Sequence, residues 1–214
     1  MQKLRFSYKK TGRMKYLSHL DMMRVITRAL TVSKLPFWIT EGFNPHIYLN
    51  FLLPLPLGVE SEREFCDFKF LPDESYENAA EKINKYLPGG IEILAFYPQK
   101  ADAESIKKAE YLFEIETGKE IKAELGVFLK EDKMPILKRG KKKNTEINLK
   151  DFLENVSVSY EDDMAKVLVT LPAGQESNVN PLYFITVFDA FNKKECFYRI
   201  KRQRLLTENG TEFE

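Results

Sequence analysis

The segment LRFSYKKTGRMKYLSHLDMMRVITRAL, residues 4–30, decides how the first half of the chain folds. Residues 4–8 alternate apolar and polar side chains, which predicts a β-strand. Ser18 and Asp21 form an S-x-x-D capping box, which predicts that a helix begins just after Ser18. Pro36 ends this helix, whose predicted apolar face consists of Leu20, Met23, Ile26 and Leu30. The chain therefore opens with a strand followed by an amphipathic helix.

The rest of the first half continues with alternating apolar segments separated by turn-forming residues. We expect strands at residues 47–53, 65–71 and 91–97 and a helix at residues 76–86. The order of elements is β-α-β-β-α-β, the split βαβ arrangement of ferredoxin-like folds.

The second half repeats this order less clearly. The predicted elements are strands at 111–115, 134–138, 147–149, 166–171 and 197–206 and helices at 120–129 and 181–191, with 152–160 left unassigned. The sequence thus predicts an α+β protein of two ferredoxin-like (βαββαβ) halves with antiparallel sheets. We expect an N-terminal domain at residues 1–98 and a C-terminal domain at residues 106–207.

Composition favours a cytoplasmic protein without a membrane partner. The 214 residues are 43% hydrophobic, enough for a packed core, yet no apolar run approaches the roughly 18 residues that cross a bilayer. The N-terminus lacks the apolar core of a signal peptide. Cys66 and Cys196 have no paired neighbour, so we expect two buried, reduced thiols. No nucleotide-binding, iron–sulfur or zinc motif is present, and we expect neither cofactor nor metal.

The chain has two histidines, and both lie in the first half. His19 opens the first helix, and His46 ends the motif Gly42-Phe43-Asn44-Pro45-His46. Histidine titrates near neutral pH and serves as acid, base or ligand, so both residues are candidate catalytic groups. If the ends of these elements are neighbours, the two rings share one site. The alternative is that His19 caps the helix and His46 shapes a turn.

Positive charge is concentrated near the N-terminus, where residues 1–60 hold nine Lys or Arg against three Asp or Glu. Strand alternation places Lys3, Arg5, Ser7 and Lys9 on the open face of the sheet, together with His46, Tyr48 and Asn50. Cations that meet phosphates and rings that stack on bases suit RNA. The candidate binding residues are Arg5, Lys9, Lys15, His19, Arg24, Arg28, Asn44 and His46. The alternative is a solvent-facing or subdomain-packed sheet face. The basic run at residues 138–143 is either a phosphate-contacting loop or a solvated hairpin tip.

Several short motifs of the first half resemble a known family. The matching residues are Tyr8-Lys9-Lys10-Thr11-Gly12, Leu17-Ser18-His19-Leu20-Asp21, Arg24, Arg28-Ala29-Leu30, Gly42-Phe43-Asn44-Pro45-His46, Pro54-Leu55-Pro56-Leu57-Gly58, Ser61, Glu62 and Glu64. Together they resemble the bacterial radical SAM-linked (radical-SAM-associated) proteins of unknown function, with a looser likeness through residues 138–149. Members occur alone or as a tail on a radical SAM enzyme. Because this chain lacks cluster cysteines, the resemblance implies a stand-alone member that works with a radical SAM enzyme in trans. The family has no established catalytic residues to carry over.

The predicted architecture also resembles the CRISPR repeat-processing endonucleases of the RAMP superfamily, which cut RNA without metal. The glycine-rich loop that those enzymes carry near the C-terminus is absent, since Pro172-Ala173-Gly174 is a poor substitute. The leading hypothesis is therefore a non-catalytic protein that binds RNA or presents a substrate to a radical SAM enzyme, in tRNA or ribosome modification. The alternatives are a metal-independent RNA endonuclease with His19 or His46 as general base, and a scaffold that binds only protein.

Overall fold

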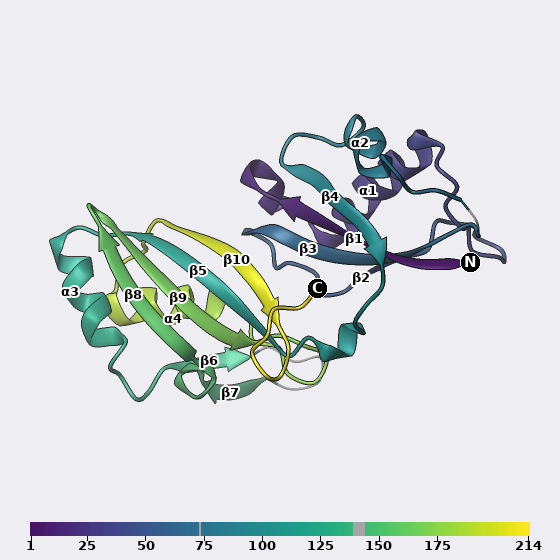
Figure 1. The fold of residues 1–214 in the computed structure, drawn as a ribbon. Helices are drawn as coiled ribbons and strands as arrows, with labels where there is room; N and C mark the ends of the chain where they lie inside the picture. Colours follow the sequence, from purple (N-terminus) through teal and green to yellow (C-terminus); the bar gives the residue numbers. More distant parts are fainter. Residues whose placement is uncertain (73, 139–143) are drawn as a thin grey trace. The chain divides into compact units, whose positions relative to one another are not determined.

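The computed structural model of the chain describes residues 1–72, 74–138 and 144–214. The chain forms two compact units, unit 1 from Met1–Ser105 with Glu214 and unit 2 from Ile106–Phe213 (Figure 1). Each unit combines helices with an antiparallel sheet, as the predicted α+β class requires. In the described part of the chain, no helix is both long and apolar enough to span a membrane.

Unit 1 contains a four-stranded sheet and two helices. Its elements are β1 (Gln2–Lys10), η1 (Gly12–Tyr16), α1 (His19–Ser33), β2 (Leu49–Phe51), β3 (Val59–Phe70), α2 (Ala79–Asn84), β4 (Ile91–Pro98) and η2 (Ala103–Ser105). The strands lie in the order β4-β1-β3-β2, and each neighbouring pair is antiparallel. Both helices lie on the same face of this sheet (Figure 1), where their apolar sides complete the core.

The first strand and helix follow from the capping and alternation of residues 4–30. Leu4, Phe6 and Tyr8 are buried, as the alternation predicts. The Ser18 hydroxyl accepts a hydrogen bond from the Asp21 amide at 3.2 Å, which confirms Ser18 as the N-cap, and it donates to the Asp21 carboxylate at 2.7 Å.

The predicted apolar face of the helix is wrong in detail. Leu20 is 63% exposed, and the core-facing residues are Met22, Ile26, Ala29 and Leu30. Their spacing of four, three and one residues follows the helical period as well as the predicted set does, so periodicity alone did not distinguish them.

Unit 2 repeats the strand order with an added hairpin. Its elements are β5 (Lys108–Glu116), α3 (Lys119–Phe128), β6 (Pro135–Lys138), β7 (Thr145–Asn148), η3 (Leu149–Phe152), β8 (Glu154–Glu161), β9 (Met164–Pro172), α4 (Leu182–Asn192) and β10 (Tyr198–Leu206). The main sheet has the order β10-β5-β9-β8 with antiparallel neighbours, and β6 pairs with β7 in a separate hairpin. Phe113 of β5 lies 4.7 Å from Phe184 of α4, and Phe128 of α3 lies 5.1 Å from Phe188 of α4. Aromatic rings thus pack α4 on the sheet and α3 on α4.

Two strand boundaries differ from the predicted ones, because polar residues are buried in one strand and most residues are exposed in the other. β8 occupies the segment that the sequence left unassigned, because most of its residues are exposed and give no apolar alternation. β3 starts at Val59, earlier than predicted, since Ser61 and Glu64 are buried despite their polarity.

Cys66 and Cys196 are both free and buried, as predicted, and burial raises the pKa of the Cys66 thiol.

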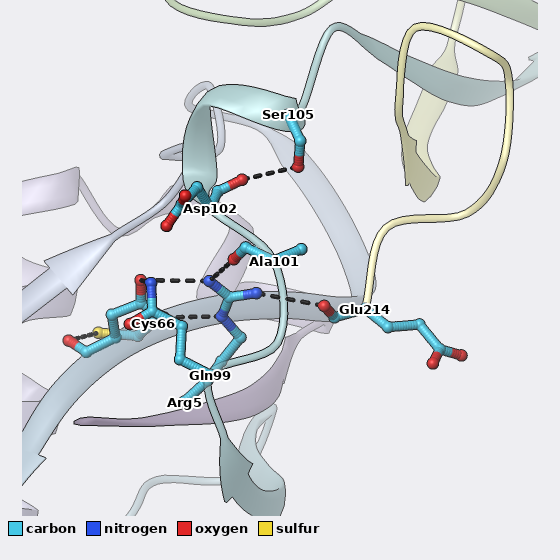
Figure 2. A network of polar contacts seen from close by, with 8 residues as sticks. Arg5, Cys66, Gln99, Ala101, Asp102, Ser105 and Glu214 are labelled. Atoms are coloured by element: carbon cyan, nitrogen blue, oxygen red, sulfur yellow. Dashed lines mark hydrogen bonds and ion pairs between the residues drawn. The ribbon is translucent and has the colours of Figure 1, made fainter. Parts of the chain in front are cut away.

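Arg5 lies on the sheet face opposite the helices, as the alternation predicts, but its side chain is 0% exposed, so this part of the face is not open to a ligand. Asp67 lies directly opposite on β3 and accepts from Arg5 Nε at 2.7 Å and from Nη2 at 3.2 Å. Nη2 also donates to the Ala101 carbonyl at 2.8 Å, and Nη1 donates to the Glu214 carbonyl at 3.2 Å (Figure 2). Gln99 donates to Asp67 at 3.2 Å. The guanidinium is therefore enclosed by its acceptors and does not reach an external ligand.

We predict that unit 1 depends on this buried ion pair for stability. Arg5→Met should lower the free energy of unfolding by about 3–5 kcal/mol, because it leaves the Asp67 carboxylate buried without its cation. The measurement is urea-induced unfolding followed by fluorescence of Trp38, the one tryptophan in the chain, which lies in unit 1. Arg24→Met, which removes the exposed partner of Asp21, is the matched control and should leave the midpoint almost unchanged. Equal midpoints for the two variants would contradict the prediction.

Candidate nucleic-acid interface

The loop at residues 38–48 joins α1 to β2 and carries the Gly42-Phe43-Asn44-Pro45-His46 motif. Ile39 and Ile47 form an antiparallel bridge, and the Thr40 amide donates to the His46 carbonyl at 2.8 Å. The Thr40 hydroxyl accepts from the His46 amide at 3.1 Å. These contacts close the loop at Thr40 and His46, and the residues between them form its tip.

The His46 ring is tied to the same closure. Its Nδ1 lies 2.8 Å from the Asn44 carbonyl oxygen and 3.1 Å from the Thr40 hydroxyl. Since a carbonyl oxygen only accepts, Nδ1 carries the hydrogen in this bond, and Nε2 of the neutral ring is left as an acceptor. Among the predicted binding residues, His46 and Asn44 are therefore brought together, and the bond between them uses the main chain of Asn44.

Phe43 stands at the tip of this loop with an exposed fraction of 112%, greater than that of a reference residue in an extended chain. Single exposed apolar residues are common and by themselves indicate nothing. Because hydrogen bonds between Thr40 and His46 close the base of the loop, the exposed Phe43 ring at its tip is available for stacking. The adjacent sheet face provides further aromatic rings.

Four side chains form what we call the lysine–aromatic patch: Trp38 and Tyr48 from the two ends of the loop, Lys3 from β1 and Lys69 from β3. Lys69 Nζ lies 4.5 Å from the centre of the Trp38 ring and 4.8 Å from that of Tyr48. Lys3 and Lys69 are direct cross-strand partners between β1 and β3. Within residues 1–72, 74–138 and 144–214, neither lysine forms an ion pair. Like charges directly opposite in a sheet repel each other, so an anion bound here would relieve an unfavourable contact.

The other predicted cations are mostly neutralised. Lys9 pairs with Glu92 at 2.5 Å, and this bond raises the Lys9 pKa. Lys15 pairs with Glu60 at 3.2 Å, and Arg24 pairs with Asp21 at 2.9 Å. Arg28 is exposed on α1 and has no ion-pair partner in the described parts of the chain.

The structure does not bring the two histidines together. β1 and β2 both run antiparallel to β3, so they point the same way, and α1 returns between them. His19 at the start of α1 packs edge-on against Phe51 at the end of β2, with ring centres 5.5 Å apart. His46 precedes β2, and five residues of extended chain span about 16 Å. One small ligand therefore cannot contact both rings, and the shared acid–base site loses its geometric basis.

His19 has a distinct electrostatic environment. Partial burial, and in second place the positive charge of Lys10, lower the pKa of His19 below its ordinary value of 6.5. Lys10 itself is buried and donates from Nζ to the Leu17 carbonyl at 2.9 Å, just before the helix begins. His19 is therefore neutral at physiological pH and does not add to the positive charge of unit 1.

The basic run at residues 138–143 lies outside the described residues, apart from Lys138. Lys138 Nζ donates to the Asn178 carbonyl at 3.1 Å, a contact within unit 2. The predicted role of this run as a phosphate-contacting loop stays a prediction.

The comparison with protein families matches the chain to "Uncharacterized protein conserved in bacteria (DUF2344)" over residues 3–181. The chain belongs to this family. The match covers residues 3–105 of unit 1, including the 38–48 loop and the lysine–aromatic patch, and extends in unit 2 to residue 181, just before α4. A comparison with curated proteins finds no match.

Sequence reasoning identified part of the patch. Strand alternation placed Lys3 and Tyr48 on the open face, but Trp38 and Lys69 were not singled out. Trp38 lies in a loop without periodicity, and Lys69 lies in a strand whose register with β1 is a tertiary property. The lone tryptophan, ten residues before another aromatic residue, was the available clue.

We predict that the folded chain titrates His19 below pH 6.5. The measurement is a proton NMR titration of the imidazole resonances, with His46→Gln identifying the His19 signal because the chain has two histidines. Since burial is the larger cause, raising the salt concentration should recover only the smaller part of the shift.

The lowered pKa of His19 also predicts the direction in which folding stability changes with pH. The unfolded chain protonates His19 at a higher pH than the folded chain, so stability should fall as pH drops through 6.5 and level off below the folded pKa. His19→Gln should remove this component of the pH dependence. A His19 titration at or above 6.5 would contradict the lowered pKa that partial desolvation and the Lys10 charge produce.

Proposed function

We propose that this protein binds single-stranded RNA through the lysine–aromatic patch and Phe43 of the 38–48 loop, without cleaving it. The observation that carries the proposal is Lys69, whose Nζ lies close to the rings of both Trp38 and Tyr48 and whose cross-strand partner is Lys3. Among the residues that the structure describes, neither lysine has a carboxylate partner. Elsewhere in the first half, the candidate cations Lys9, Lys15 and Arg24 already have carboxylate partners.

The energetics favour an exchange of partners at the patch. A cation over an aromatic ring contributes about 0.5–1 kcal/mol at an exposed site. A nucleic acid base stacked on an aromatic ring contributes roughly 1–3 kcal/mol. Lys69 therefore gains by turning from the rings to a phosphate while a base takes its place. Stacking of this kind requires unpaired bases, so the ligand is single-stranded RNA or an exposed loop.

We also propose that each unit is ferredoxin-like, with β6 and β7 as an insertion in unit 2. The supporting observation is the strand order, β4-β1-β3-β2 in unit 1 and β10-β5-β9-β8 in unit 2, which places corresponding strands in corresponding positions. In unit 1 the sheet face opposite the helices is covered at Arg5 by the segments of Ala101 and Glu214. The proposed ligand would therefore occupy the part of this face at Lys3 and Lys69.

We further propose that a radical SAM enzyme acts in trans on the bound RNA, in tRNA or ribosome modification. Support comes from the motif resemblance and from the cysteines. Cys66 and Cys196 are the chain's two cysteines, lie in different units and are both buried, so they do not form a cluster-binding set. The iron–sulfur cluster would then belong to the companion.

We predict that removing the two unpaired lysines weakens RNA binding more than removing paired ones. Lys3→Gln with Lys69→Gln should weaken binding of a labelled single-stranded oligonucleotide at least tenfold. It should also flatten the log–log dependence of affinity on salt by about 1.4, two contacts at about 0.7 each. The measurement is fluorescence anisotropy at two salt concentrations.

Two further double variants carry the same change of net charge. Lys9→Gln with Lys15→Gln removes paired cations and should change affinity little, and Arg24→Gln with Arg28→Gln tests the α1 surface. A larger loss from the α1 variant would move the interface to that helix.

Binding that is absent or equal in all variants would leave protein binding as the role of the aromatic rings. Discrete, EDTA-resistant cleavage that disappears in His19→Ala or His46→Ala would make the protein an endonuclease instead.

We predict that the tagged chain, purified without oxygen from a bacterium that naturally contains it, retains a second protein with an iron–sulfur cluster. The cluster should be visible by its broad absorbance near the visible–ultraviolet boundary and by its iron content, and it should be absent from the isolated chain. Purification of the chain alone, under crosslinking as well as native conditions, would contradict the companion.

A further inference from the structure

β8 forms the outer edge of the sheet in unit 2, with β9 on one side and no strand of the described residues on the other (Figure 1). Within the described parts of the chain, residues 155–160 form no hydrogen bond apart from those of the β8–β9 ladder. An exposed strand edge is a template for pairing with another strand. We propose that two copies of this chain pair through β8, antiparallel about a twofold axis at Val158. The proposal concerns unit 2 alone and does not depend on RNA binding by unit 1.

The outer strand of unit 1, β4, has a closed edge by comparison. The Asn84 side-chain nitrogen donates to the Ile93 carbonyl at 2.8 Å, and the Asn84 side-chain oxygen accepts from the Ile93 amide at 2.8 Å. Both main-chain groups of Ile93 are thereby occupied, and Pro98 ends the strand without an N–H to donate. β8 contains no proline, and no described side chain bonds to its main chain in this way. The edge of β8 is therefore open to a second strand where that of β4 is not.

The part of β8 that suits a second strand is the segment at residues 156–160. Asn155 before it has a positive φ of 49°, and the register with β9 shifts at the same place, so the strand is bent there. The segment itself contains no Lys, Arg, Asp or Glu, whose charges commonly protect the edge of a sheet. Val158 is the midpoint of the segment. A symmetric pair that uses the whole segment therefore has its twofold axis at Val158.

This register brings complementary side chains opposite each other. Val156 and Tyr160 are 40% and 37% exposed, and an axis at Val158 sets each of them opposite the other in the second copy. A β-branched side chain opposite an aromatic ring is a favourable cross-strand pair. Registers shifted by two residues would instead set Tyr160 opposite Glu154, or Val156 opposite Asp162. A shift by one residue would put the apolar side chains of the two copies on different faces.

The charges at the two ends of β8 do not oppose the pairing. Lys108 is bonded to Glu154 at 2.6 Å, and Lys166 is bonded to Glu161 at 2.5 Å. These bonds raise the pKa of both lysines, so each glutamate keeps a charged partner within its own chain. In the proposed register Glu161 lies opposite Asn155, which is uncharged. No like charges therefore lie directly opposite each other along residues 155–161, where they would repel.

The test measures the mass of the full chain by analytical ultracentrifugation at concentrations up to about 200 µM. Wild type should change from the mass of one chain to that of two as the concentration rises. In the variant Ser157→Glu with Ser159→Glu, each new carboxylate faces another in the second copy, so the dissociation constant should rise at least tenfold. The control Gln175→Glu with Ser177→Glu adds the same charge at exposed positions between β9 and α4 and should dimerise like wild type. Circular dichroism checks that both variants are folded.

Two further arms test the register and the location of the contact. In Ser157→Glu with Ser159→Lys, each glutamate faces a lysine of the second copy, so this variant should dimerise at least as tightly as wild type. The β8 amides that do not bond to β9 should exchange hydrogen at least tenfold more slowly in the dimer than in the monomer.

Five results would each overturn the proposal. These are a wild type that stays monomeric over the whole range, a double-glutamate variant that dimerises like wild type, a control that is weakened as much as that variant, a monomeric glutamate–lysine variant, and β8 amides whose exchange does not change with concentration.

Discussion

The buried pair of Arg5 and Asp67 constrains unit 1 more than any other polar interaction described. A guanidinium withdrawn from water costs several kcal/mol unless each donor finds an acceptor in good geometry. Here Asp67 supplies two oxygens, and the carbonyls of Ala101 and Glu214 supply the others. Because Ala101 follows β4 and Glu214 is the one residue of unit 1 that follows unit 2 in the chain, the pair holds sequence-distant segments against the same sheet face. The register of β1 on β3, which sets Arg5 opposite Asp67, also sets Lys3 opposite Lys69.

The distribution of ion pairs, rather than the number of basic residues, distinguishes the candidate interface. The chain has 33 Lys and Arg, against 32 Asp and Glu, so cations alone identify no surface. Each cation that lies within 4 Å of a carboxylate has already exchanged water for that partner and gains less from a phosphate. The lysine–aromatic patch differs because its two lysines face each other and one of them rests on aromatic rings. A polyanion satisfies both, and its bases find the rings.

The two histidines have different surroundings in unit 1. His19 at the start of α1 packs edge-on against Phe51 at the end of β2. His46 precedes β2, and its ring contacts the Asn44 carbonyl. Each ring therefore has its own set of neighbours.

The sequence by itself determined the α+β class, the order of the elements in unit 1 and the start of the first helix. These features depend on neighbouring residues: alternation in β1, the Ser18 cap, and Pro and Gly residues that end elements. It also indicated that the 38–48 loop matters, through the motif with Phe43 and His46. It did not indicate β8, because an exposed edge strand carries no hydrophobic period. Only the tertiary structure decided that Arg5 is buried, that Lys69 meets Trp38, and that the two histidines are apart. Each of these depends on strand register and direction, which bring together residues far apart in the chain, and no local pattern encodes them.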